Sequence, residues 1–177
     1  MGFFKDDLKQ VRAFIFDIDG VISHQTQSIA PDGELIRTSC TKDGYAMMYA
    51  IRKGYVVAVI SGGGTPGIQK RLEKLGLKNE DIYLKVPNKL EALAEIIERY
   101  QLKKEEMVYM GDDIPDYNVM TQVGLHVCPL DACEEIKAIS RYISDLSGGN
   151  GCVRDIITQV LKARGDWMDT HCYVKSM

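Results

Sequence analysis

Two short acidic clusters carry the side chains best suited to chemistry in this chain of 177 residues. Asp17 and Asp19 form the first cluster, and Asp112, Asp113 and Asp116 form the second. An unperturbed aspartate titrates near pH ~3.9, so these carboxylates are ionised at neutral pH and repel one another where they meet. A hard cation relieves that repulsion, and oxygen ligands of this kind favour Mg²⁺. The alternative for each acid alone is a helix cap or a solvated loop side chain.

Asp17 and Asp19 are suited to different tasks. A carboxylate at a strand end can attack a bound electrophile and form an acyl-phosphate, and we predict this task for Asp17. Asp19 can give a proton to the leaving oxygen and then take one from the water that breaks the intermediate. Gly20 omits a side chain where the backbone must turn away from such a site.

Two further segments could bind a phosphoryl group. Ser61 and Gly62 combine a hydroxyl with bare backbone N–H groups, which suits phosphate oxygens. Lys89 supplies a compact positive charge. Taken separately, the first segment is equally typical of a plain glycine-rich loop, and the second of a solvated surface lysine.

These residues can act together only if the fold gathers them at one edge. Near-continuous apolar runs predict buried strands of a parallel sheet, and stripes of apolar residues between them predict helices. The alternation indicates an α/β fold with a doubly wound parallel sheet, whose ligands bind beyond the carboxyl ends of the strands. The predicted strands are 11–16, 55–60, 107–110 and 124–127, and the predicted helices are 43–53 with Asp43 as N-cap, 68–75, 90–97 and 153–161.

The composition excludes several classes of function. Lys and Arg number 22 against 25 Asp and Glu, and the net charge of −3 gives no reason to expect a nucleic acid partner. No apolar stretch is long enough to span a membrane, and residues 1–10 do not form a signal peptide. Five cysteines without CxxC spacing argue against zinc or a disulfide framework, so we expect reduced thiols and a cytoplasmic location.

Residues 16–21, Ser61-Gly62, Lys89 and residues 111–116 resemble, in order and spacing, the four motifs of the haloacid dehalogenase superfamily of phosphatases. The resemblance implies a Rossmann-like fold in which Asp17 is the nucleophile and Asp19 the general acid and base. It also implies Mg²⁺ bound by the Asp17 carboxylate, the Asp19 backbone carbonyl and Asp112. Ser61 and Lys89 would hold the phosphoryl group, and Asp116 would support the waters of the metal.

Many members of this superfamily carry a cap domain, but the intervals between these motifs are too short to hold one. Residues 21–38 can form only a small β-hairpin flap. We therefore expect one capless phosphatase domain over residues 1–164, followed by a C-terminal tail over 165–177. Trp167 and Tyr173 are unusually apolar for a free end, and they either anchor the tail to another subunit or belong to a disordered terminus.

A closer resemblance is to the 3-deoxy-D-manno-octulosonate 8-phosphate phosphatases. It rests on residues 33–45, 88–90, 111–116, 123–125 and 148–154, and it runs from about 11 to 161. It implies a homotetramer, in which flaps and tails complete neighbouring sites, and a small-molecule sugar phosphate as substrate. Relatives that act on nine-carbon keto-sugar acid phosphates of the sialic acid type remain an alternative.

Some positions depart from the family pattern, which leaves the sugar acid open. Gly63 and Lys42 replace arginines, and His24-Gln25 replaces an Asp-Gly pair. Arginine binds a carboxylate through two hydrogen bonds, so other cationic side chains must bind the carboxylate of the sugar acid in place of the missing arginines. The candidate substrate-binding residues are Gly62, Lys42, Asp43, Gly44, Arg71 and Arg154; a surface role is the alternative for the three cations.

Two functions of other classes compete with a phosphatase. A receiver domain of a signalling protein also uses a strand-end aspartate, Mg²⁺ and a lysine, but it places paired acids on the first strand and its phosphorylated aspartate later in the chain. A non-catalytic partner of a sugar nucleotidyltransferase would not need the pair Asp17 and Asp19.

Overall fold

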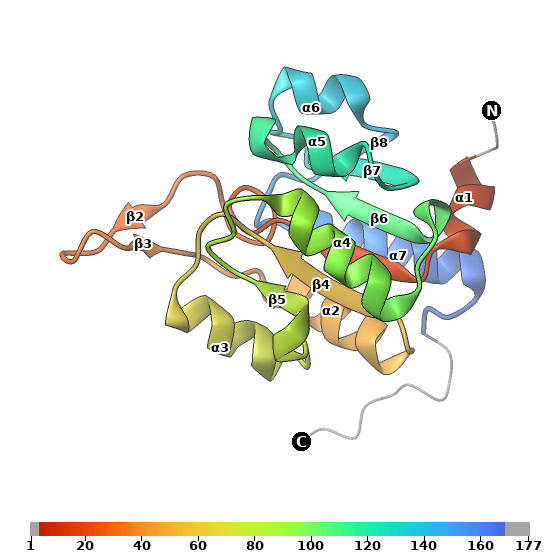
Figure 1. Ribbon diagram of the computed structural model, residues 1–177, viewed down its shortest axis with the longest axis horizontal. Coiled ribbons are helices and arrows are strands. Elements are labelled where there is room, and N and C mark those ends of the chain that lie inside the picture. The colour runs from red at the N-terminus through yellow and green to blue at the C-terminus, as the bar shows by residue number, and fades with distance from the viewer. Residues whose placement is uncertain (1–3, 169–177) are drawn as a thin grey trace.

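The structure of the protein is a computed structural model that describes residues 4–168. At its centre, these residues form a six-stranded parallel sheet in the order β5-β4-β1-β6-β7-β8 (Figure 1). Ala13 of β1 lies opposite both Val56 of β4 and Met107 of β6. The strands are β1 (Ala13–Phe16), β4 (Val56–Ile60), β5 (Ile82–Tyr83), β6 (Met107–Met110), β7 (Leu125–Cys128) and β8 (Tyr142–Ile143). The doubly wound parallel sheet predicted from the sequence is confirmed.

Helices cover both faces of the sheet. They are α1 (Phe4–Gln10), α2 (Thr41–Arg52), α3 (Pro66–Lys74), α4 (Lys89–Tyr100), α5 (Tyr117–Met120), α6 (Glu134–Ile139) and α7 (Cys152–Arg164). Short 3₁₀ turns lie at Asn79–Asp81, Lys104–Glu106 and Ile114–Asp116.

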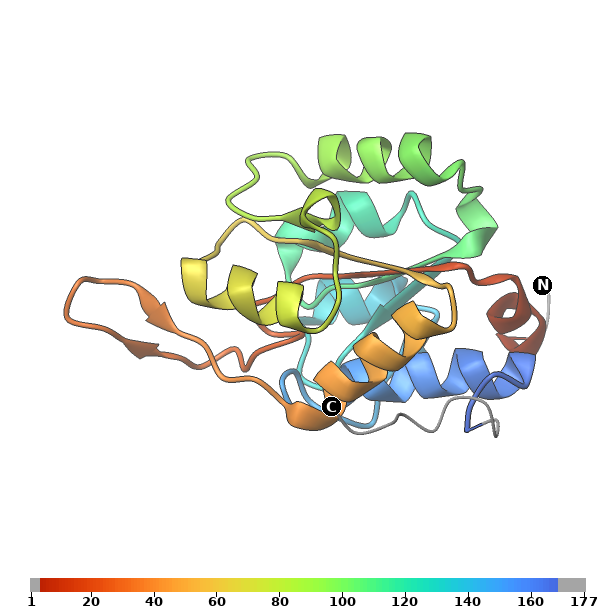
Figure 2. The same ribbon diagram turned by 90° about the horizontal axis from the view of Figure 1, so that it is seen from below.

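Two hydrophobic cores lie on opposite faces of the sheet, because the side chains of successive strand residues point to opposite faces. Phe14 and Phe16 pack into the core built with α2 and α7, whereas Ala13 and Ile15 face the core built with α4 and α6. Figure 2 shows green α4 on one side of the sheet and α2 and α7, in orange and blue, on the other. Since both faces are covered, a ligand must enter at the edge of the sheet.

Asp43 does not cap its own helix, which corrects the sequence prediction. Helix α2 begins at Thr41 with Cys40 as N-cap, so Asp43 lies inside the first turn. Its buried carboxylate accepts hydrogen bonds from the backbone N–H groups of Gly151 at 3.1 Å and Arg154 at 2.7 Å. Asp43 therefore caps α7, whose first N–H groups have no partner within the helix.

The segment between β1 and α2 forms the expected hairpin flap. Its strands, β2 (Ser28–Ile29) and β3 (Leu35–Ile36), pair antiparallel and project away from the sheet (Figure 1). Ile29 and Ile36 are 72% and 55% exposed. No cap domain occurs among the described residues, since this hairpin and α2 fill the interval from β1 to β4.

The start of the tail packs on the same chain. The centroid of the Trp167 ring lies 5.1 Å from that of Tyr49 on α2. The Arg154 guanidinium lies over the Trp167 ring, 5.4 Å from its centroid. Trp167 thus packs on its own chain. The sequence left open an anchor on another subunit or a disordered terminus, and Tyr173 lies outside the described residues. Between residues 4 and 168, no helix combines the length and apolarity that crossing a bilayer requires.

Candidate active site

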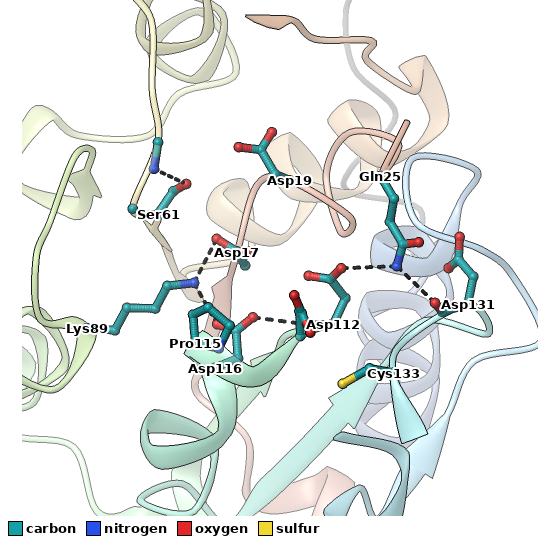
Figure 3. Close-up of a pocket in the computed structure, with 13 residues that line it drawn as sticks. Asp17, Asp19, Gln25, Ser61, Lys89, Asp112, Pro115, Asp116, Asp131 and Cys133 are labelled. Atoms are coloured by element: carbon teal, nitrogen blue, oxygen red, sulfur yellow. Dashed lines mark hydrogen bonds and ion pairs between the residues drawn. The ribbon is translucent and has the colours of Figure 1, made fainter. Parts of the chain in front are cut away.

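The motif residues meet at the carboxyl edge of the sheet, as predicted. Asp17 follows β1, Ser61 follows β4, and Asp112 comes two residues after β6. Lys89 is the first residue of α4. A cavity of about 550 Å³ lies among them (Figure 3). Its lining contains the predicted residues Asp17, Asp19, Ser61, Gly62, Lys89, Asp112, Asp113 and Asp116.

Three buried carboxylates form the floor of this cavity. Oxygens of Asp17, Asp112 and Asp116 lie within 4.8 Å of one another. Burial, and then repulsion by Asp116, raises the pKa of Asp17 to about 7, and burial with repulsion by Asp17 raises the pKa of Asp112 to about 7. An arrangement that makes ionisation this costly fits a bound cation, and an all-oxygen donor set fits a hard one.

Asp116 supports the other two acids rather than offering free oxygens. Its Oδ1 accepts hydrogen bonds from Lys89 at 2.7 Å and from the Tyr109 hydroxyl at 2.8 Å. Its Oδ2 accepts one from the backbone N–H of Asp112 at 3.3 Å. The role that the resemblance implied for Asp116, supporting the waters of the metal, stays a prediction.

Lys89 places a buried positive charge beside the candidate nucleophile. Its Nζ lies 3.0 Å from Asp17 Oδ1 and 2.7 Å from Asp116 Oδ1. Although burial favours the neutral amine, the carboxylates of Asp17 and Asp116 outweigh it and raise the pKa of Lys89. The side chain is therefore cationic and can attract a phosphoryl group to Asp17.

Asp19 occupies a different environment from Asp17. Its carboxylate points away from the Asp17–Asp112 cluster (Figure 3) and accepts two hydrogen bonds from Arg37, each 2.8 Å long. Gln27 and Ser23 donate to its Oδ1 as well, at 2.6 and 3.3 Å. Burial opposes ionisation, but these donors prevail and lower the pKa of Asp19.

The backbone near the acids leaves no room for extra atoms. Gly20 has φ +88°, and a Cβ there would lie 1.9 Å from Asp112 Oδ2. This close approach confirms why a residue without a side chain follows Asp19. Across the cavity, the Gly63 N–H donates to Ser61 Oγ at 3.2 Å, which holds the hydroxyl beside the Gly62–Gly63 loop.

Apart from Gly62, which lines the cavity, the candidate substrate-binding residues lie elsewhere in the single chain. Lys42, Asp43, Gly44, Arg71 and Arg154 are all absent from the described lining of the cavity. Asp43 caps α7, Arg154 stacks on Trp167, and a Cβ on Gly44 would lie 2.8 Å from Arg71 Nη2.

Sequence reasoning missed several residues of the site. Gln25 donates to Asp112 Oδ2 at 3.1 Å and to the Asp131 carbonyl at 2.9 Å. Arg37 and Gln27 reach Asp19 from the flap. The flap has no periodic pattern, so its sequence gave no sign of which side chains turn inward. Asp131 and Cys133 also line the cavity.

Comparison with known proteins agrees with this geometry. A family described as haloacid dehalogenase-like hydrolase matches residues 69–156. The chain is 31% identical over 157 residues to the 3-deoxy-D-manno-octulosonate 8-phosphate phosphatase KdsC of Salmonella typhi, covering 89% of this chain and 82% of that protein.

Solved structures of such phosphatases superpose closely on this chain. The enzyme of Yersinia pestis gives a TM-score of 0.87 at 30% identity, with 92% of this chain and 86% of that one covered. The enzyme of Moraxella catarrhalis, in complex with a magnesium ion, a phosphate ion and KDO, gives 0.86 at 26% identity, with 92% of each chain covered. With this extent of similarity and its four motifs gathered at one cavity, the chain belongs to the 3-deoxy-D-manno-octulosonate 8-phosphate phosphatase family of haloacid dehalogenase-like hydrolases.

Proposed function

We propose that the protein is a Mg²⁺-dependent phosphatase that hydrolyses 3-deoxy-D-manno-octulosonate 8-phosphate. The observation that carries the proposal is the position of Asp17, which is buried at the cavity floor between Lys89 and Asp112. The names of the relatives supply the substrate and the metal. A nine-carbon sugar acid phosphate of the sialic acid type is the alternative substrate.

The residues at the cavity floor fit Mg²⁺. The carboxylates of Asp17 and Asp112 and the backbone carbonyl of Asp19 would hold it, and Asp116 would support its waters. When bound, Mg²⁺ neutralises the clustered carboxylates and withdraws charge from phosphoryl oxygens. The high pKa values of Asp17 and Asp112 in the metal-free protein are the structural reason to expect this cation.

The chemistry divides between two aspartates. Ser61, Gly62 and Lys89 hold the phosphoryl group while an Asp17 oxygen attacks phosphorus and the bond to the sugar oxygen breaks. Although its contacts lower its pKa in the free protein, Asp19 must carry a proton in the substrate complex, and it gives that proton to the sugar oxygen, so the sugar leaves as an alcohol. Asp19 then takes a proton from water, whose oxygen attacks phosphorus and releases phosphate and free Asp17.

The remaining proposals concern the assembly. We propose a homotetramer in the cytoplasm, with residues 1–164 as the phosphatase domain and the flap and the tail (165–177) completing neighbouring sites. The exposed Ile29 and Ile36 of the flap support such contacts. The proposed substrate-binding set remains Gly62, Lys42, Asp43, Gly44, Arg71 and Arg154. Sedimentation equilibrium of the purified protein measures the subunit number.

A phosphate-release assay tests the activity. Purified protein with Mg²⁺ is supplied with the eight-carbon substrate, a nine-carbon 9-phosphate and a simple hexose phosphate. We expect the eight-carbon ester to have the highest kcat/KM and Asp17→Asn to release no phosphate. Equal release by Asp17→Asn and wild type would refute the enzyme and favour a non-catalytic partner. Equal rates on all three esters would refute the substrate assignment alone.

A further inference from the structure

The flap contacts the catalytic machinery directly, through Arg37. This residue follows β3, and its side chain is 6% exposed. Its Nε donates to Asp19 Oδ1 and its Nη2 to Asp19 Oδ2, each at 2.8 Å. A two-point contact between a guanidinium and a carboxylate fixes the orientation of both planes, which a single hydrogen bond does not.

A second flap residue completes the support. Gln27 donates to Asp19 Oδ1 at 2.6 Å and also to Ser23 Oγ at 3.0 Å. Ser23 itself donates to Asp19 Oδ1 at 3.3 Å and to the Ile18 carbonyl at 3.2 Å. Asp19 is thus held from the flap on one side and from its own turn on the other.

The opposite wall of the cavity makes space for this arrangement. A Cβ on Gly63 would lie 2.7 Å from Arg37 Nη2 and 3.0 Å from Asp19 Oδ2. Any side chain at position 63 would therefore push on the ion pair. Because position 63 has no side chain, the Arg37–Asp19 pair fits against this loop, and Asp19 lines the cavity.

The position of Arg37 argues against a direct role in binding the substrate anion. Its Nη1 is buried and has no hydrogen-bond partner among the described residues. An arginine that clamped a substrate anion would present this nitrogen to the cavity, but Arg37 does not belong to the described lining. Leaving a buried donor unpaired is costly, so the pairing of the other two nitrogens with Asp19 must hold the side chain in place.

We propose that Arg37, assisted by Gln27, is a positioning residue that fixes the orientation of the Asp19 carboxyl group, which takes up a proton in the substrate complex and gives it to the leaving oxygen. The flap then builds part of the acid–base machinery besides bordering the cavity. This inference rests on the proposed phosphatase function, and it adds a role for two residues outside the four motifs.

The test compares two phosphate esters that differ in their need for an acid. p-Nitrophenyl phosphate has a leaving group that departs without a proton, whereas the sugar oxygen of 3-deoxy-D-manno-octulosonate 8-phosphate needs one. General acid catalysis contributes about 10²- to 10⁴-fold, and a misplaced acid loses part of that. For Arg37→Gln we expect kcat/KM for the sugar ester to fall about 10- to 100-fold and that for the aryl ester to fall less than about threefold. KM for the sugar ester should stay within about twofold.

Two variants control the experiment. Arg12→Gln removes an arginine that pairs with Glu106 at the amino end of β1, and it should leave both esters at wild-type rates. Arg37→Lys keeps the charge but loses the two-point contact, so it should restore only part of the loss. Thermal unfolding of each variant shows whether it is folded. If Arg37→Gln is not folded, Arg37→Lys is compared with the wild type instead.

The outcomes separate the inference from the proposed function. Equal losses of kcat/KM on both esters would show that Arg37 has only a structural role. A rise in KM with unchanged kcat would show that it binds the substrate, and full activity of Arg37→Lys would show that the two-point contact is not needed. Each of these results overturns the inference. If the wild type hydrolyses the aryl ester but not the sugar ester, the proposed substrate fails instead.

Discussion

Neutralising Asp112 should make the metal-free protein more stable while it abolishes metal binding. Asp112 is 5% exposed and shares its site with Asp17 and Asp116. Burial, followed by the repulsion of those two acids, raises its pKa from 3.8 to about 7. That difference corresponds to about 4 kcal/mol of unfavourable free energy for the ionised folded form. Because Asp17 and Asp116 relax when one member of the cluster is neutralised, we expect Asp112→Asn to gain about 2 kcal/mol at pH 8.

The sign of the pH dependence follows from the same values. Between pH 4 and 7 the folded protein keeps protons on Asp17 and Asp112 that the unfolded chain has lost. Without metal, the free energy of unfolding of the wild type therefore falls as pH rises through this range and levels off above it. The curve of Asp112→Asn should be flatter, because one of these titrating groups is gone.

Urea unfolding from pH 5 to 9, with EDTA or with Mg²⁺, measures both effects. Mg²⁺ at about a hundred times its Kd should stabilise the wild type by about 2.7 kcal/mol and should not stabilise Asp112→Asn. A variant less stable than the wild type at pH 8 in EDTA would refute the reasoning, as would a wild-type curve without slope below pH 7. Asp113→Asn, which alters an exposed carboxylate beside the cluster, is the matched control for the stability in EDTA.

Two further substitutions test other parts of the structure. Lys89→Met removes the cation between Asp17 and Asp116, and kcat for phosphate release should fall about 10²- to 10³-fold; a loss below tenfold would contradict the role of Lys89. Asp43→Ala leaves two N–H groups at the start of α7 without an acceptor, and urea unfolding should show a loss of about 2 to 4 kcal/mol. Asp43→Asn keeps one acceptor oxygen and should lose less, so equal losses would argue against capping.

The parts of the site that follow strands could be predicted because short-range patterns define them. The apolar run of β1 ends at Phe16, and that of β6 ends at Met110. Parallel pairing brings these carboxyl ends together, so Asp17 and Asp112 had to meet whatever the loops did. The positions of these acids required only the ends of the strands and the handedness of the fold.

The rest depends on contacts between distant segments that leave no local pattern. Asp43 stands where a cap of α2 is common, yet its partner Gly151 is 108 positions away. Arg37 lies in an irregular flap, and only the folded chain shows that it reaches Asp19 instead of solvent. In both cases the residue type indicated a polar contact, but the sequence did not reveal the hydrogen-bond partner. That partner is determined by the packing of helices and loops.

The two aspartates of the first motif lie in different surroundings, although they are two positions apart. Asp17 lies among other acids under the sheet edge, where burial raises its pKa to about 7 until a cation arrives. Asp19 has left the strand and meets Arg37 and Gln27, which lower its pKa despite partial burial. A cation at the floor would reverse the balance at Asp17 and leave it ionised and nucleophilic. Asp19 stays outside the carboxylate cluster, which separates its proposed role as general acid and base from the proposed role of Asp17. Through Arg37 and Gln27, the flap thereby gives Asp19 surroundings that neither the strand nor the turn after it could provide alone.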